Sequence, residues 1–181
     1  MTFGEILTRV TIWVAFIAYA IGVVLFVRSG RTGRLDSFTR LAWTTGSVAL
    51  VAHFVCAFHF YHGWSQASAY RETARQTDAV VGFNWGGGLF INYFVLIAWV
   101  VDISLWWLKG LDSYRRRPWQ VLVAWHAFLL FIIFNATIVF KTGVVRWIGV
   151  ALCAVICLGW LLLFVGARAT SPASFSGSEP S

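Results

Sequence analysis

The sequence predicts an all-α integral membrane protein built as a bundle of five transmembrane helices. Of its 181 residues, 59% are hydrophobic and only 12% are charged, whereas a soluble domain has about 45–50% apolar and about 25% charged residues. A chain of this size has too much surface to hide such an excess of apolar side chains inside a globule. Five segments also reach the roughly 20 mostly apolar residues that a membrane-crossing helix needs. The first predicted partner of the chain is therefore the lipid bilayer.

The five predicted helices follow one another within a single membrane domain, residues 1–166. Their approximate bounds are 10–27, 41–61, 89–108, 119–140 and 144–165. The fourth begins directly after Pro118, whose missing N–H costs nothing in the first turn of a helix. The remaining segment, 167–181, is rich in small and polar residues. We expect this segment to be a disordered cytoplasmic tail.

The basic residues between the predicted helices indicate how the bundle is oriented. Cytoplasmic loops are enriched in Lys and Arg, so the side with more of them is expected to face the cytoplasm. This places the N-terminus outside and the C-terminus inside. The net charge of +7 is explained by this asymmetry, and we expect no nucleic-acid partner. The short loops favour a bacterial inner (plasma) membrane. The basic residues on the richer side are Arg28, Arg31, Arg34, Arg40, Lys109, Arg115, Arg116, Arg117 and Arg168.

One long polar loop, residues 62–88, joins the second and third predicted helices on the outer side. Its stretch 65–77 has few helix breakers and predicts a short surface helix, which the hydroxyl of Ser65 can cap. Three consecutive glycines, residues 86–88, then give a flexible entry to the third membrane helix. This loop is the expected docking site for a protein partner, if the chain has one.

Polar side chains inside the predicted spans are the candidate functional residues, because they are costly in lipid and need a partner or a role. With about 1.5 Å of rise per residue, Asp102 and His126 both lie about 9–11 Å from the inner end of their helices. We therefore expect an Asp–His pair, carried by the second to fourth helices together with the other polar groups, while the first and fifth helices pack outside. A second polar group near the outer boundary consists of His59, Asn92, Asn135 and Asn84.

The leading cofactor hypothesis is a haem held between His53 and His126. Neutral histidines on two facing membrane helices can supply both axial ligands of a haem iron. Gly46 and two nearby alanines lie on the helix of His53 and would allow a flat ring to approach closely. The alternative is structural, with both histidines hydrogen-bonded across the bundle.

A weaker hypothesis places a metal ion at His59 and His62. The two residues are three positions apart and would share one face of an α-helix, and imidazole is a good ligand for zinc or copper. A third ligand would have to come from Glu72, from Asp78 or from another histidine. The alternative is a pair of interfacial histidines satisfied by water and asparagine.

The sequence leaves the specific activity unassigned. The favoured interpretation is a multipass membrane protein that acts as a haem- or metal-binding subunit through its intramembrane histidines. One alternative is a structural or assembly subunit that docks a partner through residues 62–88. Another is a small proton or solute transporter with a relay through Asp102, His126, His53 and His59. The sequence contains no phosphate loop, nucleophilic triad or pair of catalytic carboxylates, so an enzyme is the less favoured class.

Overall fold

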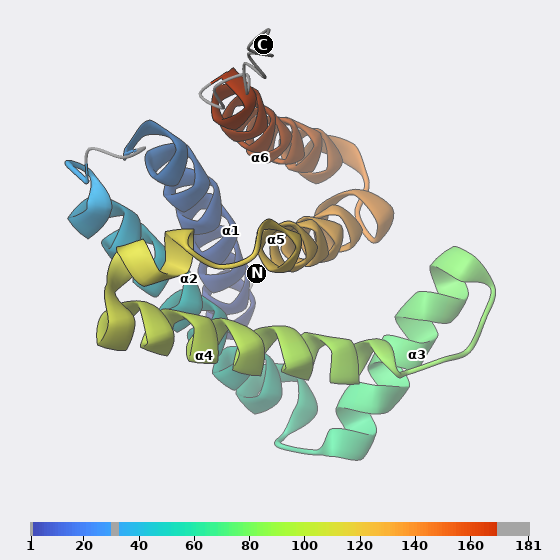
Figure 1. The fold of residues 1–181 in the computed structure, drawn as a ribbon. Helices are drawn as coiled ribbons and strands as arrows, with labels where there is room; N and C mark the ends of the chain where they lie inside the picture. The colour runs from blue at the N-terminus through green and yellow to red at the C-terminus, as the bar shows by residue number, and fades with distance from the viewer. Residues whose placement is uncertain (1, 30–32, 170–181) are drawn as a thin grey trace, which may run out of the picture.

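The computed structural model describes residues 2–29 and 33–169, with side chains described as far as residue 163, and every regular element in these ranges is helical. Two of the α-helices continue into π-helical turns, η1 and η2 (Figure 1). In chain order the elements are α1 (Phe3–Ser29), α2 (Asp36–Ala57), η1 (Phe58–His62), α3 (Gln66–Val81), α4 (Gly88–Arg115), α5 (Trp119–Phe134), η2 (Asn135–Val139) and α6 (Gly143–Ala169).

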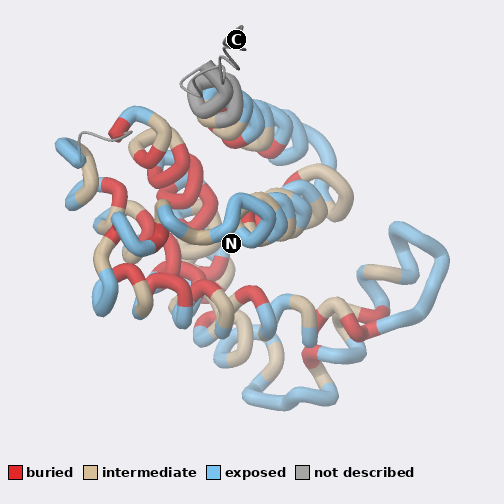
Figure 2. The backbone as a smooth tube through the Cα atoms, viewed as in Figure 1, coloured by how far each residue is buried: buried red, intermediate tan, exposed pale blue. Residues whose placement is uncertain are grey.

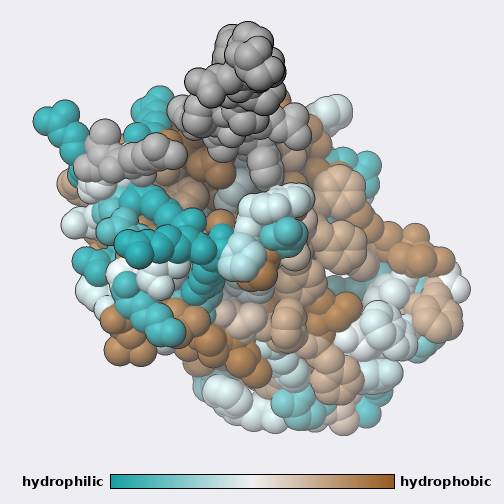
Figure 3. Space-filling model, in the orientation of Figure 1, coloured by the Kyte–Doolittle hydropathy of each residue, from teal (hydrophilic) through white to brown (hydrophobic). Residues whose placement is uncertain are grey.

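Five helices are long and apolar enough to cross a membrane, and they coincide with the five predicted segments. The all-helical prediction is confirmed, and the five helices are compatible with a multipass membrane protein. Much of the surface in Figure 3 is apolar, and hydrophilic side chains gather around the end of α4. Large apolar residues are exposed along these helices, for example Val48 at 62% and Ile97 at 63%. The predicted tail begins inside α6, and from residue 170 onwards it lies outside the described residues.

Helix α1 lies at the centre of the packing, and the expectation that it packs outside the polar interior is wrong. Its most extensive contact is with α2, and it also packs against α6. Figure 2 shows buried positions concentrated along α1 and the adjoining parts of α2 and α4. The physical reason is its small residues, because Ala15, Ala18 and Gly22 let neighbouring elements approach closely. A Cβ atom at Gly22 would lie 2.8 Å from the indole of Trp43.

The bundle has two ends of different character, named here the α3 end and the arginine end. The α3 end comprises the start of α1, η1, α3 and the start of α4, and α3 projects there away from the other helices (Figure 1). The arginine end comprises residues 33–40 and 111–118. The short helix predicted over 65–77 is confirmed as α3, and the Ser65 hydroxyl accepts a hydrogen bond from the Ser68 N–H at 3.2 Å.

Gly110 breaks the regular path of α4 near the arginine end. Its φ of 74° lies in the left-handed region, which glycine adopts at little cost because it has no Cβ atom. The segment after Gly110 is turned against the bundle, so that Leu111 and Tyr114 are buried. Tyr114 thereby reaches Trp106 on the same helix, with 4.3 Å between the ring centroids.

Candidate functional site

A cavity of about 280 Å³ lies in the half of the bundle nearer to α3. Side chains of α1, α2, α4, α5 and η2 line it together with residues of η1 and α3. None of the lining residues of η1 and α3 is buried, and this side is named here the mouth of the cavity. The deeper walls are mostly apolar and aromatic, and the mouth is polar. The apolar walls include Ile12, Phe16, Leu50, Phe54, Trp99 and Leu129. The polar residues that line the cavity include His53, His62, Glu72, Gln76 and Asn92.

His53 is a half-buried residue of α2 that is anchored to α1. Its Nδ1 atom lies 2.9 Å from the backbone carbonyl oxygen of Thr8. A carbonyl can only accept, so Nδ1 carries the hydrogen and donates it. In the neutral ring this leaves Nε2 with an unshared electron pair. The backbone of α1 therefore sets both the orientation and the tautomer of a histidine that lines the cavity.

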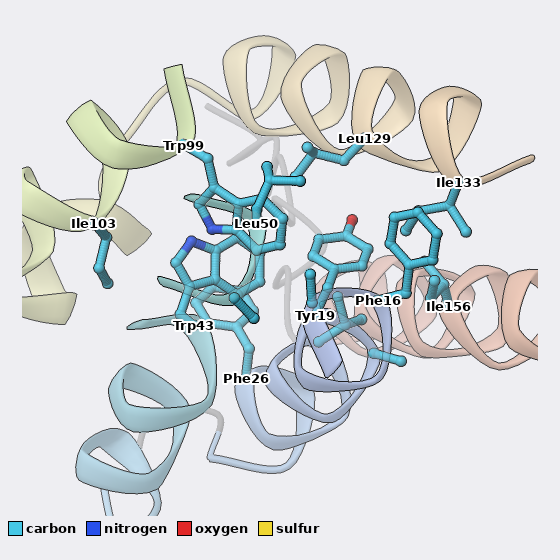
Figure 4. Packing of buried hydrophobic residues seen from close by; sticks show 14 of the residues in the cluster. Phe16, Tyr19, Phe26, Trp43, Leu50, Trp99, Ile103, Leu129, Ile133 and Ile156 are labelled. Carbon is cyan, nitrogen blue, oxygen red and sulfur yellow. The ribbon is translucent and has the colours of Figure 1, made fainter. Parts of the chain in front are cut away.

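His126 of α5 is held in the opposite way, with both ring nitrogens engaged. The Tyr19 hydroxyl lies 3.0 Å from Nδ1, and the Tyr114 hydroxyl lies 2.7 Å from Nε2. The ring is only 4% exposed, and the indole of Trp160 covers it with 4.1 Å between centroids. Figure 4 shows the Tyr19 ring among the buried apolar side chains, with its hydroxyl pointing toward α5. The Tyr19–His126–Tyr114 triad thus ties α1, α4 and α5 together.

Asp102 is paired with Arg117 and not with His126, so the predicted Asp–His pair is wrong. The Arg117 guanidinium donates to one carboxylate oxygen, and the Trp43 indole N–H donates to the other at 3.1 Å. Position along a helix predicts the height of Asp102 and His126 but not the direction in which either side chain points. The turn after Gly110 brings Arg117 back to Asp102, while Tyr19 and Tyr114 occupy both nitrogens of His126.

His59 and His62 face different surroundings because they lie in the π-helical turn η1. The wider turn of a π-helix breaks the spacing that places residues i and i+3 on one face. His62 lines the cavity, whereas His59 is exposed beside Phe60. Among the residues that the structure describes, no group of three His, Cys, Asp or Glu side chains could hold a metal ion. The metal hypothesis therefore lacks support from the geometry.

Glu72 at the cavity mouth, proposed as a third metal ligand, is paired within α3. Its carboxylate accepts a hydrogen bond from Arg75 at 2.7 Å and another from Gln76 at 2.8 Å. The hydrogen bond from Arg75 is the main reason why the pKa of Glu72 falls to about 2. Asp78, the other carboxylate proposed for the metal, is exposed and does not line the cavity.

The three asparagines expected in one outer cluster are not brought together. Asn92 lines the cavity, and Asn84 is exposed in the loop before α4. Asn135 begins η2, and its side-chain amide donates to the Phe131 carbonyl at 2.7 Å. Of the site residues predicted from the sequence, His53, His62 and Asn92 line the cavity.

The geometry does not support a haem between His53 and His126. Axial coordination needs an unshared electron pair on a ring nitrogen, and both nitrogens of His126 are engaged by tyrosines. The space beside Gly46 is also filled, since a Cβ atom there would lie 2.9 Å from the indole of Trp99.

Several residues that organise the site did not stand out in the sequence. The sequence alone does not single out Tyr19 and Tyr114, because a tyrosine in an apolar segment is usually an amphipathic packing residue. Arg117 lies in a predicted cytoplasmic loop, and Thr8 contributes only a backbone carbonyl. One signal was available: a tyrosine hydroxyl in the middle of a membrane span needs a partner, and Tyr19 lies there.

Comparison with protein-family models, with curated proteins and with solved structures gave no match. Within the described ranges, the cavity beside His53 combines room for a small molecule with polar groups that can orient it.

Proposed function

We propose that this chain is a multipass membrane protein that binds a small, largely apolar molecule in the cavity beside His53. The cavity carries the proposal, because small-molecule sites are concave, mostly apolar and equipped with a few polar groups. Its volume of about 280 Å³ is close to the roughly 300 Å³ at which such sites begin. An engineered apolar cavity of about 150 Å³ holds benzene, so this one accommodates a somewhat larger molecule.

The proposed orientation places the cavity mouth at the outer surface. The N-terminal end of α1 lies at the α3 end, and Arg28, Arg40, Arg115 and Arg117 lie at the other end. Since basic residues favour the cytoplasmic side, the arginine end is the inner one. The ligand then enters from the outer leaflet or the outer aqueous phase, past His62 and Glu72. A bacterial inner membrane remains the proposed location.

A pair of size-increasing substitutions tests the binding function. Ala136 lines the cavity, and Ala127 lies on the same membrane-spanning segment but is exposed. Ala136→Phe should fill the cavity, while Ala127→Phe adds the same volume to the lipid-facing surface. The probe is para-fluoroanisole, titrated against the protein in phospholipid nanodiscs and followed by fluorine NMR. We expect saturable binding to wild type and Ala127→Phe, and at least a tenfold loss of affinity in Ala136→Phe.

Two results would contradict the binding function. One is a wild-type titration that shows only partitioning into lipid, both for this probe and for its phenol analogue, and the other is unchanged affinity in Ala136→Phe. Ala57→Phe fills the cavity from α2. A loss of affinity in this variant as well shows that the effect of Ala136→Phe does not come from a folding defect in η2. Thermal unfolding of each variant in the same nanodiscs shows whether the bundle is intact.

A second candidate, an assembly subunit that docks a partner through residues 62–88, is favoured by apolar residues at the end of α3. Val81 is 65% exposed and Phe83 is 62% exposed. Replacing both by serine should reduce co-purification of a partner from native membranes. Equal recovery of the same proteins with the variant and with wild type would count against this candidate.

A further inference from the structure

We infer that the occupant of this cavity is a neutral molecule with an aromatic ring and a hydroxyl group, and that this hydroxyl donates to Nε2 of His53. The inference rests on the proposed binding function and adds the chemical class of the ligand. Phenols and hydroquinones can form this hydrogen bond, whereas quinones and ethers can occupy the cavity only without it and should bind more weakly.

The first step is the direction of the hydrogen bond at His53. Nδ1 donates to the Thr8 carbonyl at 2.9 Å, so the neutral ring offers an acceptor and no further donor. In the described part of the chain, no side chain or backbone group hydrogen-bonds to Nε2. Nε2 is not among the fully buried atoms that lack a partner, so it stays accessible to a molecule in the cavity. A ligand that donates can therefore form a hydrogen bond with this atom, and a ligand with only acceptor atoms cannot.

The second step is the charge of the donor. The walls around His53 carry apolar side chains such as Phe16, Leu50 and Phe54, and a charged group in such surroundings pays a large desolvation cost. The carboxylate at the mouth, Glu72, is already neutralised by Arg75 at 2.7 Å. An ammonium group therefore gains little at the mouth and loses much in the deeper part. A neutral hydroxyl donates without this cost.

The third step is the shape of the apolar part of the ligand. Four of the residues that line the cavity carry aromatic side chains without a charge or a free hydroxyl, namely Phe16, Phe54, Phe58 and Trp99. Aromatic groups pack favourably against such rings in stacked and edge-to-face geometries. The volume of about 280 Å³ holds one ring with short substituents, given that about 150 Å³ holds benzene.

Two probes of nearly equal shape test the hydrogen bond directly. Para-fluorophenol can donate, and para-fluoroanisole, its methyl ether, cannot. Both are titrated by fluorine NMR against wild type, His53→Leu and His59→Leu in nanodiscs, with separate correction for partitioning into lipid. We expect wild type and His59→Leu to bind the phenol about tenfold more tightly than the ether, a ratio typical of one hydrogen bond. His53→Leu should bind both probes equally.

Each of the other outcomes overturns a defined part of the inference. Equal affinity of the two probes for wild type excludes the donated hydrogen bond but leaves the binding function intact. A preference that persists in His53→Leu shows that another group accepts the hydrogen bond. Binding of fluorohexanol, a flexible alcohol, as tight as that of the phenol excludes the aromatic ring. Absence of saturable binding for both aromatic probes contradicts the binding function itself.

Discussion

The two halves of the bundle hold their buried histidines in different ways. In the half near the arginine end, Trp43 and Trp106 stack with 5.0 Å between centroids, and Asp102 and His126 have partners on each side. In the half near α3, a cavity of about 280 Å³ remains, and His53 uses only one of its nitrogens. The first half is filled by packed side chains, and the second keeps the cavity that we propose as the ligand site.

The contrast is sharpest between His126 and His53, which lie in adjoining parts of the same apolar interior. Each is positioned by α1, through the Tyr19 side chain in one case and the Thr8 carbonyl in the other. Two partners consume the whole hydrogen-bonding capacity of a neutral imidazole, and one partner leaves an acceptor. The number of hydrogen-bond partners therefore indicates whether a buried histidine only stabilises the bundle or can also bind a ligand. Its depth in the membrane does not distinguish these two roles.

The largest expected effect comes from breaking the Asp102–Arg117 ion pair in the half near the arginine end. Asp102→Leu leaves the Arg117 guanidinium without its partner, and breaking a buried pair costs about 3–5 kcal/mol. Because the Arg117 side chain keeps 25% exposure, we expect the lower part of this range. Denaturant unfolding in detergent micelles measures the loss.

The matched control is Asp112→Leu, which removes a carboxylate that is 79% exposed and 3.6 Å from Arg115. Exposed pairs contribute about 0–1 kcal/mol, so this variant should stay close to wild type. The double variant Asp102→Leu/Arg117→Leu should recover part of the loss, because it removes both buried charges. Equal stability of the two single variants would show that the buried ion pair does not stabilise the half near the arginine end.

The two histidines provide the second prediction. His126→Leu leaves the buried hydroxyls of Tyr19 and Tyr114 without their partner, and we expect a loss of about 2–3 kcal/mol. His53→Leu removes one hydrogen bond to a carbonyl and should cost about 1 kcal/mol or less. Thermal unfolding of both variants under identical conditions gives the comparison. A larger loss for His53→Leu would reverse the assignment of support and binding.

The five membrane helices could be predicted because lipid leaves little choice of structure. A backbone in lipid must satisfy its hydrogen bonds within each segment, so long apolar runs become helices. The capped helix α3 was predictable for a local reason, since Ser65 and the residues after it contain all the necessary information. The membrane helices and the cap of α3 are both determined by residues that lie close together in the sequence.

The site was less predictable because its contacts join distant segments. Tyr19 and His126 are 107 positions apart, and the rotation of each helix decides whether they meet. The π-helical turn at Phe58–His62 separates two histidines that a regular helix would align. The bend at Gly110 returns Arg117 to Asp102. Each of these depends on backbone geometry that a helical periodicity cannot reveal.

Adding volume should destabilise the half near the arginine end more than the half near α3. A Cβ atom at Gly46 would lie 2.9 Å from the Trp99 indole and 3.3 Å from the Ala15 carbonyl oxygen, so Gly46→Ala should destabilise the protein by about 1–2 kcal/mol through overpacking. Ala57→Val adds two carbon atoms to the cavity wall and should change the stability by less than about 0.5 kcal/mol. Chemical unfolding of both variants measures how much each substitution lowers the free energy of unfolding. A similar loss in both would show that the half near α3 is as tightly packed as the other.

The smallest expected effect concerns the pH dependence of the cavity mouth. The pKa of Glu72 is lowered to about 2 by Arg75, against about 4.3 for an unperturbed glutamate. A carboxylate whose pKa is lower in the folded state stabilises that state above the unfolded pKa, and this contribution disappears as the pH falls from about 4.3 through about 2. The Glu72 side chain is 37% exposed, so solvent screening keeps the contribution to stability small.

NMR titration of the Glu72 carboxyl measures the shift of its pKa directly. Arg75→Gln should return the pKa toward its ordinary value, whereas Arg71→Gln, which removes an exposed arginine one residue away, should leave it low. Titration of Glu72 at its ordinary pKa in wild type would show that solvent separates the pair, and that the mouth carries an unneutralised carboxylate able to attract a cationic ligand.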